Sequence, residues 1–101
     1  MPNKLNFELS RLSLNDIDNI WTYTAQKWTK SQANKYYKNL FKDISLICKN
    51  PDIGKRIEFV KPKHRIFKSK SHLIIYKLDN QKIWIDRILH ERMDIENKLK
   101  E

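Results

Sequence analysis

The hydrophobic pattern of this chain changes its period at Pro51. Between residues 14 and 49 the apolar residues recur every three or four positions, which is typical of amphipathic helices. After it, β-branched and aromatic residues gather in short runs, which is typical of strands. A chain of 101 residues in which helices precede strands favours one α+β domain, residues 1–101, with the helices packed on an antiparallel sheet.

A strand and a helix are expected at the start of the chain. Residues 4–9 alternate between apolar and polar side chains, and this alternation predicts a half-buried strand. Ser13 and Asp16 have the spacing of a capping box. We therefore expect Ser13 to cap a helix over residues 14–28, with Asp16 in its first turn.

A second helix should follow almost without a break. Thr29 and Gln32 form another capping-box pair, and the apolar stripe that follows them ends near Lys49. Asn50 can end a helix in the left-handed conformation, and Pro51 cannot continue it. Since hardly any residue separates the two helices, they are expected to pack against each other as an antiparallel hairpin.

The second half of the chain predicts an antiparallel meander. Asp79 and Asn80 tolerate the positive φ angles of a tight hairpin, and Asp94 is well placed to cap a last helix. The overall order is β-α-α-β-β-β with a short C-terminal helix. The expected segments are a turn at 51–54, a short strand and loop within 55–64, strands at 65–68, 72–78 and 82–90, a reversal at 69–71, and a helix at 94–100.

Both faces of the predicted sheet carry apolar residues. Simple alternation puts Ile83, Ile85 and Leu89 on one face of the last strand and Trp84 and Ile88 on the other. The helical hairpin can cover one face only. The C-terminal helix, a second copy of the chain or a segment of a partner could cover the other face, and we favour the partner.

The charge is strongly positive and unevenly distributed. The net charge is +9, and residues 55–77 hold eight Lys and Arg residues against Glu58 alone. This excess favours a polyanion or an acidic protein as partner, although a solvated lysine-rich face is the alternative. Cys48 is the one cysteine, which suggests a reducing cytoplasm, and we expect neither a membrane span nor a metal or cofactor.

Five segments together resemble the RelE/ParE superfamily of bacterial toxins. They keep their order and spacing over nearly the whole chain, and the last of them is the most specific. The segments are Ile20-Trp21-Thr22-Tyr23, Gln32-Ala33-Asn34-Lys35-Tyr36, Asn50-Pro51-Asp52-Ile53-Gly54, His72-Leu73-Ile74-Ile75-Tyr76 and Arg87-Ile88-Leu89-His90-Glu91-Arg92-Met93-Asp94.

This resemblance implies a cytoplasmic toxin that is neutralised by a cognate antitoxin. ParE-like members are taken to inhibit DNA gyrase, whereas RelE-like members cut messenger RNA in the ribosome. RelE-like nucleases often carry a Tyr or His near the C-terminus, and this chain has neither after Arg92. The sequence is thus closer to the ParE-like branch. It predicts a gyrase inhibitor that is not an enzyme, in a hetero-oligomer with an acidic, partly disordered ParD-like antitoxin.

The two possible activities, RNA cleavage and target binding, each suggest candidate site residues. Metal-free RNA cleavage would need an acid, a base and cations for the phosphate, and the best candidates for these are Arg65, Lys68, Arg87, His90 and Arg92. Contacts to the target or the antitoxin would come from the basic and C-terminal segments. These contact candidates are Lys63, Arg65, Lys68, Lys70, Tyr76, Trp84, Arg87, His90 and Arg92.

Structural roles for several of these residues remain open. Arg87 could pair with a helix carboxylate such as Asp16 or Asp18, and His90 could be a structural hydrogen-bonding group. Trp21 and Trp28 are expected to lie in the core rather than in a ligand site. A nonspecific nucleic-acid-binding module and a decayed toxin that only sequesters antitoxin are alternatives to an active toxin.

Overall fold

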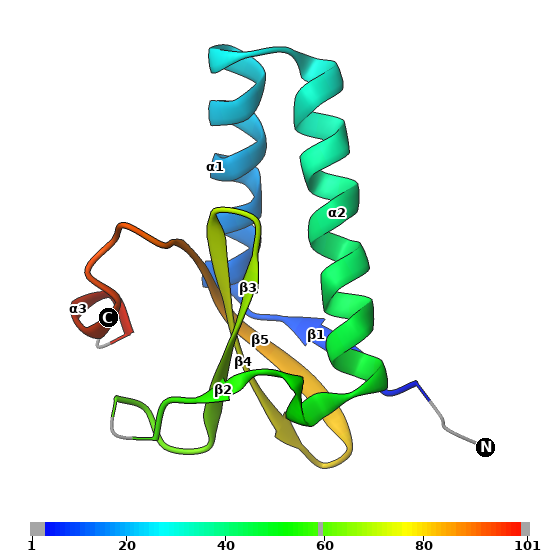
Figure 1. Ribbon diagram of the computed structural model, residues 1–101, viewed down its shortest axis with the longest axis vertical. Coiled ribbons are helices and arrows are strands. Elements are labelled where there is room, and N and C mark those ends of the chain that lie inside the picture. The colour runs from blue at the N-terminus through cyan, green and yellow to red at the C-terminus, as the bar shows by residue number, and fades with distance from the viewer. Residues whose placement is uncertain (1–3, 59, 100–101) are drawn as a thin grey trace.

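The computed structural model describes residues 4–58 and 60–99 (Figure 1). Lys100, where the C-terminal helix was predicted to end, lies outside this range. The elements in chain order are β1 (Asn6–Leu9), α1 (Arg11–Lys27), α2 (Lys30–Lys49), a 3-10 turn η1 (Pro51–Ile53), β2 (Lys55–Arg56), β3 (His64–Ser69), β4 (His72–Asp79), β5 (Lys82–His90) and α3 (Ile95–Leu99).

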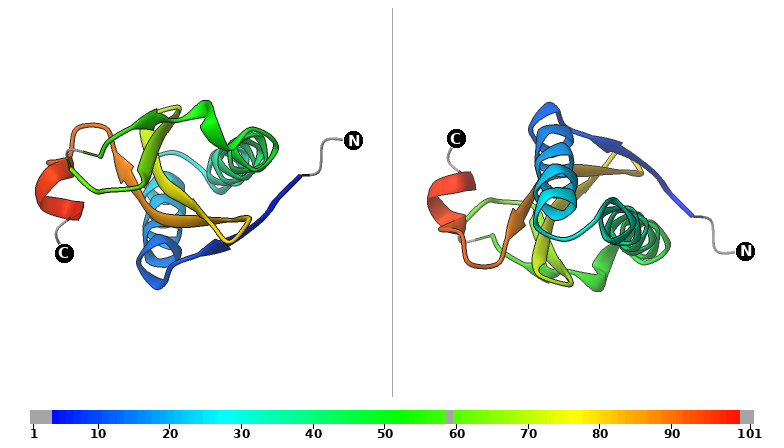
Figure 2. Two further views of the ribbon diagram at one scale, coloured as in Figure 1. Left: turned by 90° about the horizontal axis from the view of Figure 1, so that it is seen from below. Right: turned by 90° about the horizontal axis from the view of Figure 1, so that it is seen from above.

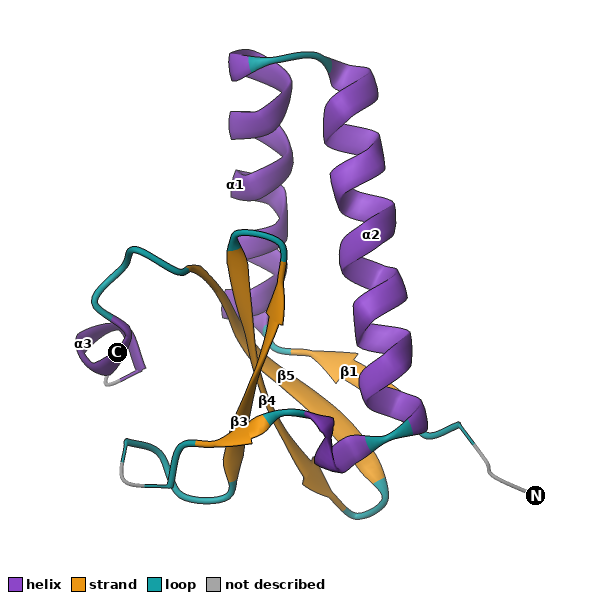
Figure 3. Ribbon diagram, viewed as in Figure 1, coloured by secondary structure: helices purple, strands orange, loops and turns teal. Residues whose placement is uncertain are grey.

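The strands form one five-stranded sheet in the order β1-β5-β4-β3-β2. The strands β2 to β5 pair antiparallel, and β1 pairs parallel with β5. The α1-α2 hairpin stands against one face of this sheet and extends beyond its end (Figures 1 and 3). The predicted α+β architecture is therefore confirmed, and the parallel placement of β1 adds to it. No described helix is long and apolar enough to cross a membrane.

The first helix begins three residues earlier than its sequence predicted. Ser10 is the N-cap, because its hydroxyl accepts a hydrogen bond from the Ser13 backbone N–H at 3.0 Å. The same hydroxyl donates to the carbonyl oxygen of Asp86 on β5, at 2.6 Å. Ser13 itself is buried inside the helix, so its prediction as the cap was wrong. The reason is a tertiary hydrogen bond that favours Ser10 and that no local pattern reveals.

The second helix has the predicted bounds. The Thr29 hydroxyl accepts a hydrogen bond from the Gln32 backbone N–H at 3.0 Å, which confirms Thr29 as the cap, and the helix ends at Lys49. Asn50 has φ −142°, so the expected left-handed conformation is wrong. The chain instead turns directly into the 3-10 turn that Pro51 begins.

The two β-hairpin turns use non-glycine residues with positive φ. Lys70 has φ 55° between β3 and β4, at the predicted reversal. Asn80 and Gln81 have φ 51° and 58° between β4 and β5. The second turn therefore lies one residue later than expected, because Asp79 pairs with Lys82 and closes the ladder.

A bulge at Asp86 changes which residues of β5 face the helices. Ile75 pairs with Arg87 whereas Tyr76 pairs with Ile85, so Asp86 is an extra residue in β5. Side chains beyond the bulge consequently exchange faces. Ile88 joins Ile83 and Ile85 in the core under the helices, and Leu89 lies on the other face, contrary to the alternation expected from the sequence.

The second face of the sheet is covered by the chain itself. Ile75 and Leu89 are buried there with Ile57, and Leu99 of α3 completes the cluster. Figure 2 shows α3 on the side of the molecule away from α2. The expectation that a partner covers this face is therefore wrong, and the C-terminal helix provides much of the cover.

Tyr76 explains why glycine follows the second helix. The Tyr76 hydroxyl accepts a hydrogen bond from the Gly54 N–H at 2.8 Å and donates one to the Pro51 carbonyl oxygen at 2.7 Å. A Cβ atom at Gly54 would lie 2.6 Å from that hydroxyl. Because Gly54 has φ −80°, the requirement comes from this close approach and not from the backbone conformation. Two segments of the family resemblance thus meet in one contact.

We predict that Gly54→Ala lowers the free energy of unfolding by about 1–3 kcal/mol, because the new methyl group overpacks against Tyr76. Tyr76→Phe should cost about as much, since it leaves a buried N–H and a buried carbonyl without a partner. Urea denaturation of the purified variants measures both. The double variant should lose less than the sum of the single losses, and the exposed Lys55→Ala should change little. A neutral Gly54→Ala would contradict this account.

Candidate functional site

A groove of about 520 Å³ opens between the helical hairpin and the neighbouring ends of β4 and β5. Its walls come from α1, α2, β4, β5 and the segments beside them, so only the fold assembles it. The lining residues are Asp16, Asn19, Ile20, Tyr23, Thr24, Trp28, Gln32, Tyr36, Ser71, His72, Ile88, His90 and Met93.

Large apolar side chains line this groove and remain exposed. Tyr23 is 57% exposed, Trp28 is 60% exposed and Met93 is 45% exposed. The Tyr23 and Trp28 rings pack edge to face with centroids 6.5 Å apart, and the Lys27 ammonium lies 5.7 Å from each centroid. The expectation that Trp28 is a core residue is therefore wrong. Trp21 is partly buried, and its indole N–H donates to the Asn34 side-chain oxygen at 3.0 Å.

A hydrogen-bonded aromatic cluster forms the floor of the groove. The Tyr36 hydroxyl accepts from the Ser71 backbone N–H at 3.2 Å and lies 2.5 Å from Nδ1 of His72. The His72 ring packs edge to face on His90, with centroids 5.2 Å apart. This cluster ties α2 to the start of β4 and the end of β5.

Burial keeps His72 uncharged at neutral pH. Burial first, and the charge of the neighbouring His90 second, lower the pKa of His72 to about 4. Burial also raises the pKa of the Tyr36 hydroxyl. The groove floor is consequently polar but neutral at these two positions, which suits the docking of an apolar segment better than it suits proton transfer near pH 7.

Arg87 forms a buried ion pair with Asp16 of α1. The guanidinium Nε and a terminal nitrogen lie 2.9 and 3.1 Å from the two carboxylate oxygens, and the side chains are only 10% and 12% exposed. The same carboxylate accepts the Ile88 backbone N–H at 2.9 Å. The structural alternative for Arg87 is thus confirmed, with Asp16 rather than the exposed Asp18 as its partner. Asp16 lies in the second turn of α1, not in the first turn as expected.

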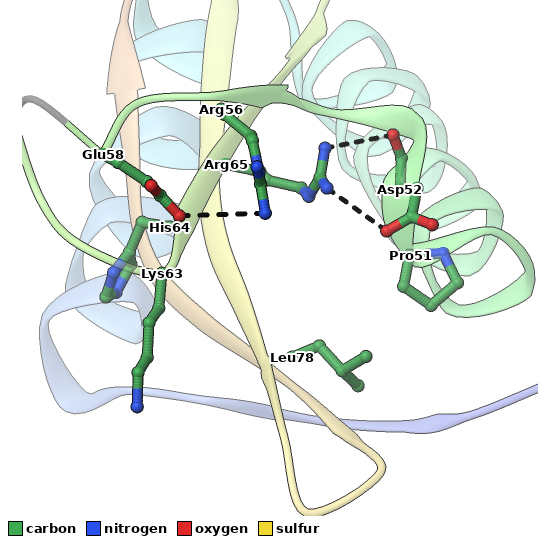
Figure 4. A pocket seen from close by; sticks show the side chains of 8 residues that line it. All are labelled: Pro51, Asp52, Arg56, Glu58, Lys63, His64, Arg65 and Leu78. Atoms are coloured by element: carbon green, nitrogen blue, oxygen red, sulfur yellow. Dashed lines mark hydrogen bonds and ion pairs between the residues drawn. The ribbon is translucent and has the colours of Figure 1, made fainter.

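Arg65 and Lys68 are also engaged by acidic or carbonyl groups. Arg65 donates to the Gly54 carbonyl at 2.7 Å and lies 3.3 Å from the Asp52 carboxylate (Figure 4). Lys68 lies 3.0 Å from the Glu91 carboxylate. That lysine lowers the pKa of Glu91 by its hydrogen bond and its charge. Arg65 is therefore held within the chain, whereas the pair of Lys68 and Glu91 lies at the surface, with side chains 62% and 38% exposed.

The pocket around Arg65 holds nearly balanced charges. It has a volume of about 230 Å³, and Figure 4 shows Arg56 reaching toward Glu58, 3.9 Å away, beside the pair of Arg65 and Asp52. Lys63 also lines this pocket. Because each arginine already faces a carboxylate, this pocket has little unpaired positive charge for an anion.

The structure separates most of the other candidates. Lys63 and Lys70 are exposed on different loops, and Trp84 lies partly buried on the sheet face away from the helices. Tyr76 is fully buried, so its side chain is not available to a partner. Nδ1 of His90 accepts the Arg92 backbone N–H at 3.1 Å, which confirms a structural hydrogen bond for this histidine.

Sequence reasoning missed several residues of the groove. Tyr36 and His72 lay within the resembling segments, yet nothing in the local pattern indicated that they meet. Tyr23 and Met93 also lay within those segments, and the missing signal was that neither had an assigned core position. Within residues 4–58 and 60–99 no three His, Cys, Asp or Glu side chains gather as a metal site would require.

The comparisons with known proteins agree with one another. The family described as "ParE toxin of type II toxin-antitoxin system, parDE" matches residues 7–95. "Toxin ParE1" of Caulobacter vibrioides is 34% identical over 88 residues, which cover 87% of this chain and 91% of that protein. "Toxin ParE1" of Mycobacterium tuberculosis is 31% identical over 84 residues, covering 82% and 86%.

A solved structure shares the fold. The structure titled "Chromosomal ParDE TA system from P. aeruginosa" contains a chain that aligns with a TM-score of 0.75 and covers 86% of this chain and 96% of its own length. The sequence identity is 15%, so this similarity supports the fold alone.

We predict that Asp16→Ala lowers the free energy of unfolding by about 3–5 kcal/mol, because it leaves the buried Arg87 guanidinium without its carboxylate. Arg87→Ala should destabilise the fold as well. Asp18→Ala, two residues away and exposed, is the matched control and should change stability by less than about 0.5 kcal/mol. Urea denaturation measures these effects. A stable Arg87→Ala variant that has lost toxicity would instead indicate a direct contact role.

Proposed function

This chain belongs to the ParE toxin family of type II toxin-antitoxin systems, and we propose that it arrests growth in the cytoplasm by inhibiting DNA gyrase. On this proposal it acts by binding and carries out no cleavage of its own, and a cognate ParD-like antitoxin neutralises it. The resemblance of the C-terminal segment Arg87–Asp94 to ParE-like members supports gyrase as the target.

The dispersal of the possible catalytic residues carries the proposal of a binding toxin. Metal-free RNA cleavage needs an acid, a base and cations directed at one phosphate. Of the five candidates, His90 lines the groove, Arg65 lines a separate pocket, and Arg92 is exposed in the turn after β5. Arg87 and Lys68 face the carboxylates of Asp16 and Glu91. Because three of the four candidate cations already face acidic groups of this chain, the arrangement favours docking over catalysis.

We predict that the purified toxin, freshly released from its antitoxin, blocks supercoiling by DNA gyrase and causes cleaved DNA to accumulate. An agarose-gel assay of relaxed plasmid with gyrase and ATP measures both effects. The control is messenger RNA on translating ribosomes, which should stay intact. If gyrase is unaffected and the ribosome-bound RNA is cut in a manner that His90→Ala abolishes, the RelE-type alternative replaces this proposal.

The groove is the surface that we assign to the antitoxin. The sheet face first considered for a partner is largely covered by α3, whereas the groove presents the exposed apolar side chains of Tyr23, Trp28 and Met93. Exposed aromatic residues beside a concave wall are typical anchors of a partner segment. The net charge of +9 favours an acidic chain that folds on binding.

We predict that the Tyr23→Ala, Trp28→Ala double variant raises the Kd for the full antitoxin by roughly tenfold or more, since exposed aromatic anchors often contribute over 1 kcal/mol each. Isothermal titration calorimetry measures this change. Tyr37→Ala is the control, because Tyr37 is 46% exposed on α2 and does not line the groove. Equal affinities of the double variant and the control variant would exclude the groove as the docking site.

A further inference from the structure

The fold neutralises half of the basic segment that dominates the sequence. Of the eight cations in residues 55–77, four lie within 4 Å of a carboxylate. These are Arg56 with Glu58, Lys61 with Asp86, Arg65 with Asp52 and Lys68 with Glu91. The other four, Lys55, Lys63, Lys70 and Lys77, are spread over β2, β4 and two loops. This segment therefore forms no continuous cationic surface.

Helix α2 carries a continuous cationic surface instead. Lys35, Lys38, Lys42 and Lys49 are all exposed and, at 100° per residue, fall within an arc of about 60°. In the described part of the chain none of the four forms an ion pair with a carboxylate. We call these four residues the lysine stripe.

The stripe lies on the outer side of the molecule. The buried residues of α2 include Ala33, Leu40, Ile44 and Ile47, and they lie on the opposite side of the helix. Figures 1 and 2 show α2 at the edge of the molecule, with one side toward α1 and the sheet and the other side free. The one acidic residue of the helix, Asp43, is partly buried and accepts a hydrogen bond from Asn39. The stripe thus faces solvent with little opposing charge.

We propose that the lysine stripe binds the phosphate backbone of duplex DNA without reading its sequence. The stripe rises by about 21 Å from Lys35 to Lys49 along a straight helix. Duplex DNA carries one negative charge for every ~1.7 Å of its axis, so this length faces several phosphates of one strand. Lysine side chains are flexible point charges that suit phosphate contacts.

The composition of the stripe favours duplex DNA over other partners. Lysine is depleted in protein–protein interfaces, which rely on aromatic, methionine and arginine anchors. Leu46 is the exposed apolar residue beside the stripe, and no aromatic side chain lies within its arc. Single-stranded nucleic acid would need aromatic rings for stacking of its bases. A rigid line of ammonium groups without such rings suits a regular double-stranded backbone.

This property does not depend on the proposed gyrase target. It gives the toxin a second contact, to DNA itself, on a helix face separate from the groove that we assign to the antitoxin. An inhibitor that holds DNA weakly would be concentrated near any enzyme that acts on DNA. Direct DNA binding is measured without gyrase, so either proposal can fail while the other stands.

Fluorescence anisotropy with a short labelled DNA duplex, titrated with antitoxin-free toxin at several salt concentrations, tests the proposal. The logarithm of the binding constant should fall with the logarithm of salt concentration with a slope of about −3 to −4, as expected for four phosphate contacts. In the variant Lys35→Gln, Lys38→Gln, Lys42→Gln the slope should lose about three units, and the affinity at low salt should fall on the order of tenfold or more.

Two variants serve as matched controls. Lys55→Gln, Lys63→Gln, Lys70→Gln loses the same charge from exposed sites outside α2 and should retain most of the affinity. Lys35→Arg, Lys38→Arg, Lys42→Arg keeps the charge of the stripe and should bind like the wild type. Circular dichroism checks that α2 is intact in each, which is expected because Gln, Lys and Arg have similar helix propensities.

Three results would overturn the inference. The first is a wild-type toxin that does not bind the duplex even at low salt. The second is an equal loss of affinity in the two Gln variants, which would mean that only net charge matters. The third is tighter binding to duplex RNA of the same sequence than to DNA, which would assign the stripe to RNA.

Discussion

The contact on which the rest of the structure depends is the one between α1 and β5 around Asp16 and Arg87. Strand β1 pairs with β5 as far as Leu9 and Ile85, and beyond that point β5 has no strand on this side. At that point the Asp16 carboxylate provides the hydrogen bonds in place of a strand, because it accepts from both the Arg87 guanidinium and the Ile88 N–H. The start of α1 thus completes the edge of the sheet and fixes the angle at which the helical hairpin stands.

The bulge at Asp86 makes that contact possible and also shapes the groove. It places Ile88 on the helix side of the sheet, and Asp86 itself faces Lys61 and His64 while Arg87 reaches Asp16. His90 follows on the same side and meets His72 and Tyr36 on the groove floor. The groove therefore lies beside the same irregularity that lets Asp16 and Arg87 join α1 to the sheet.

Tertiary pairing also redistributes the charge. Half of the cations between residues 55 and 77 lie beside carboxylates of other segments. These carboxylates belong to Asp52 in η1, Glu58 after β2, Asp86 in β5 and Glu91 after β5. Among the described residues, the lysine stripe on the outer side of α2 is a continuous cationic surface whose lysines form no ion pair with a carboxylate. The sequence pattern did not indicate it, because these lysines are spaced by three to seven positions. The four lysines come to lie on one side of the molecule only when α2 forms and its opposite side packs against the rest of the chain.

Local sequence patterns were enough to predict the kind and order of the elements, the cap at Thr29, the end of α2 at Lys49 and the resemblance to toxins of the RelE/ParE type. These features depend on residues a few positions apart, where periodicity and capping act. The tertiary structure alone decided the true cap at Ser10, the exchange of faces at Ile88 and Leu89, and the pairing of Asp16 with Arg87. Each of these joins residues more than seventy positions apart or follows from a one-residue bulge, and neither leaves a local pattern. The groove and the lysine stripe follow from those long-range contacts, because packing decides which side chains are buried and which stay exposed.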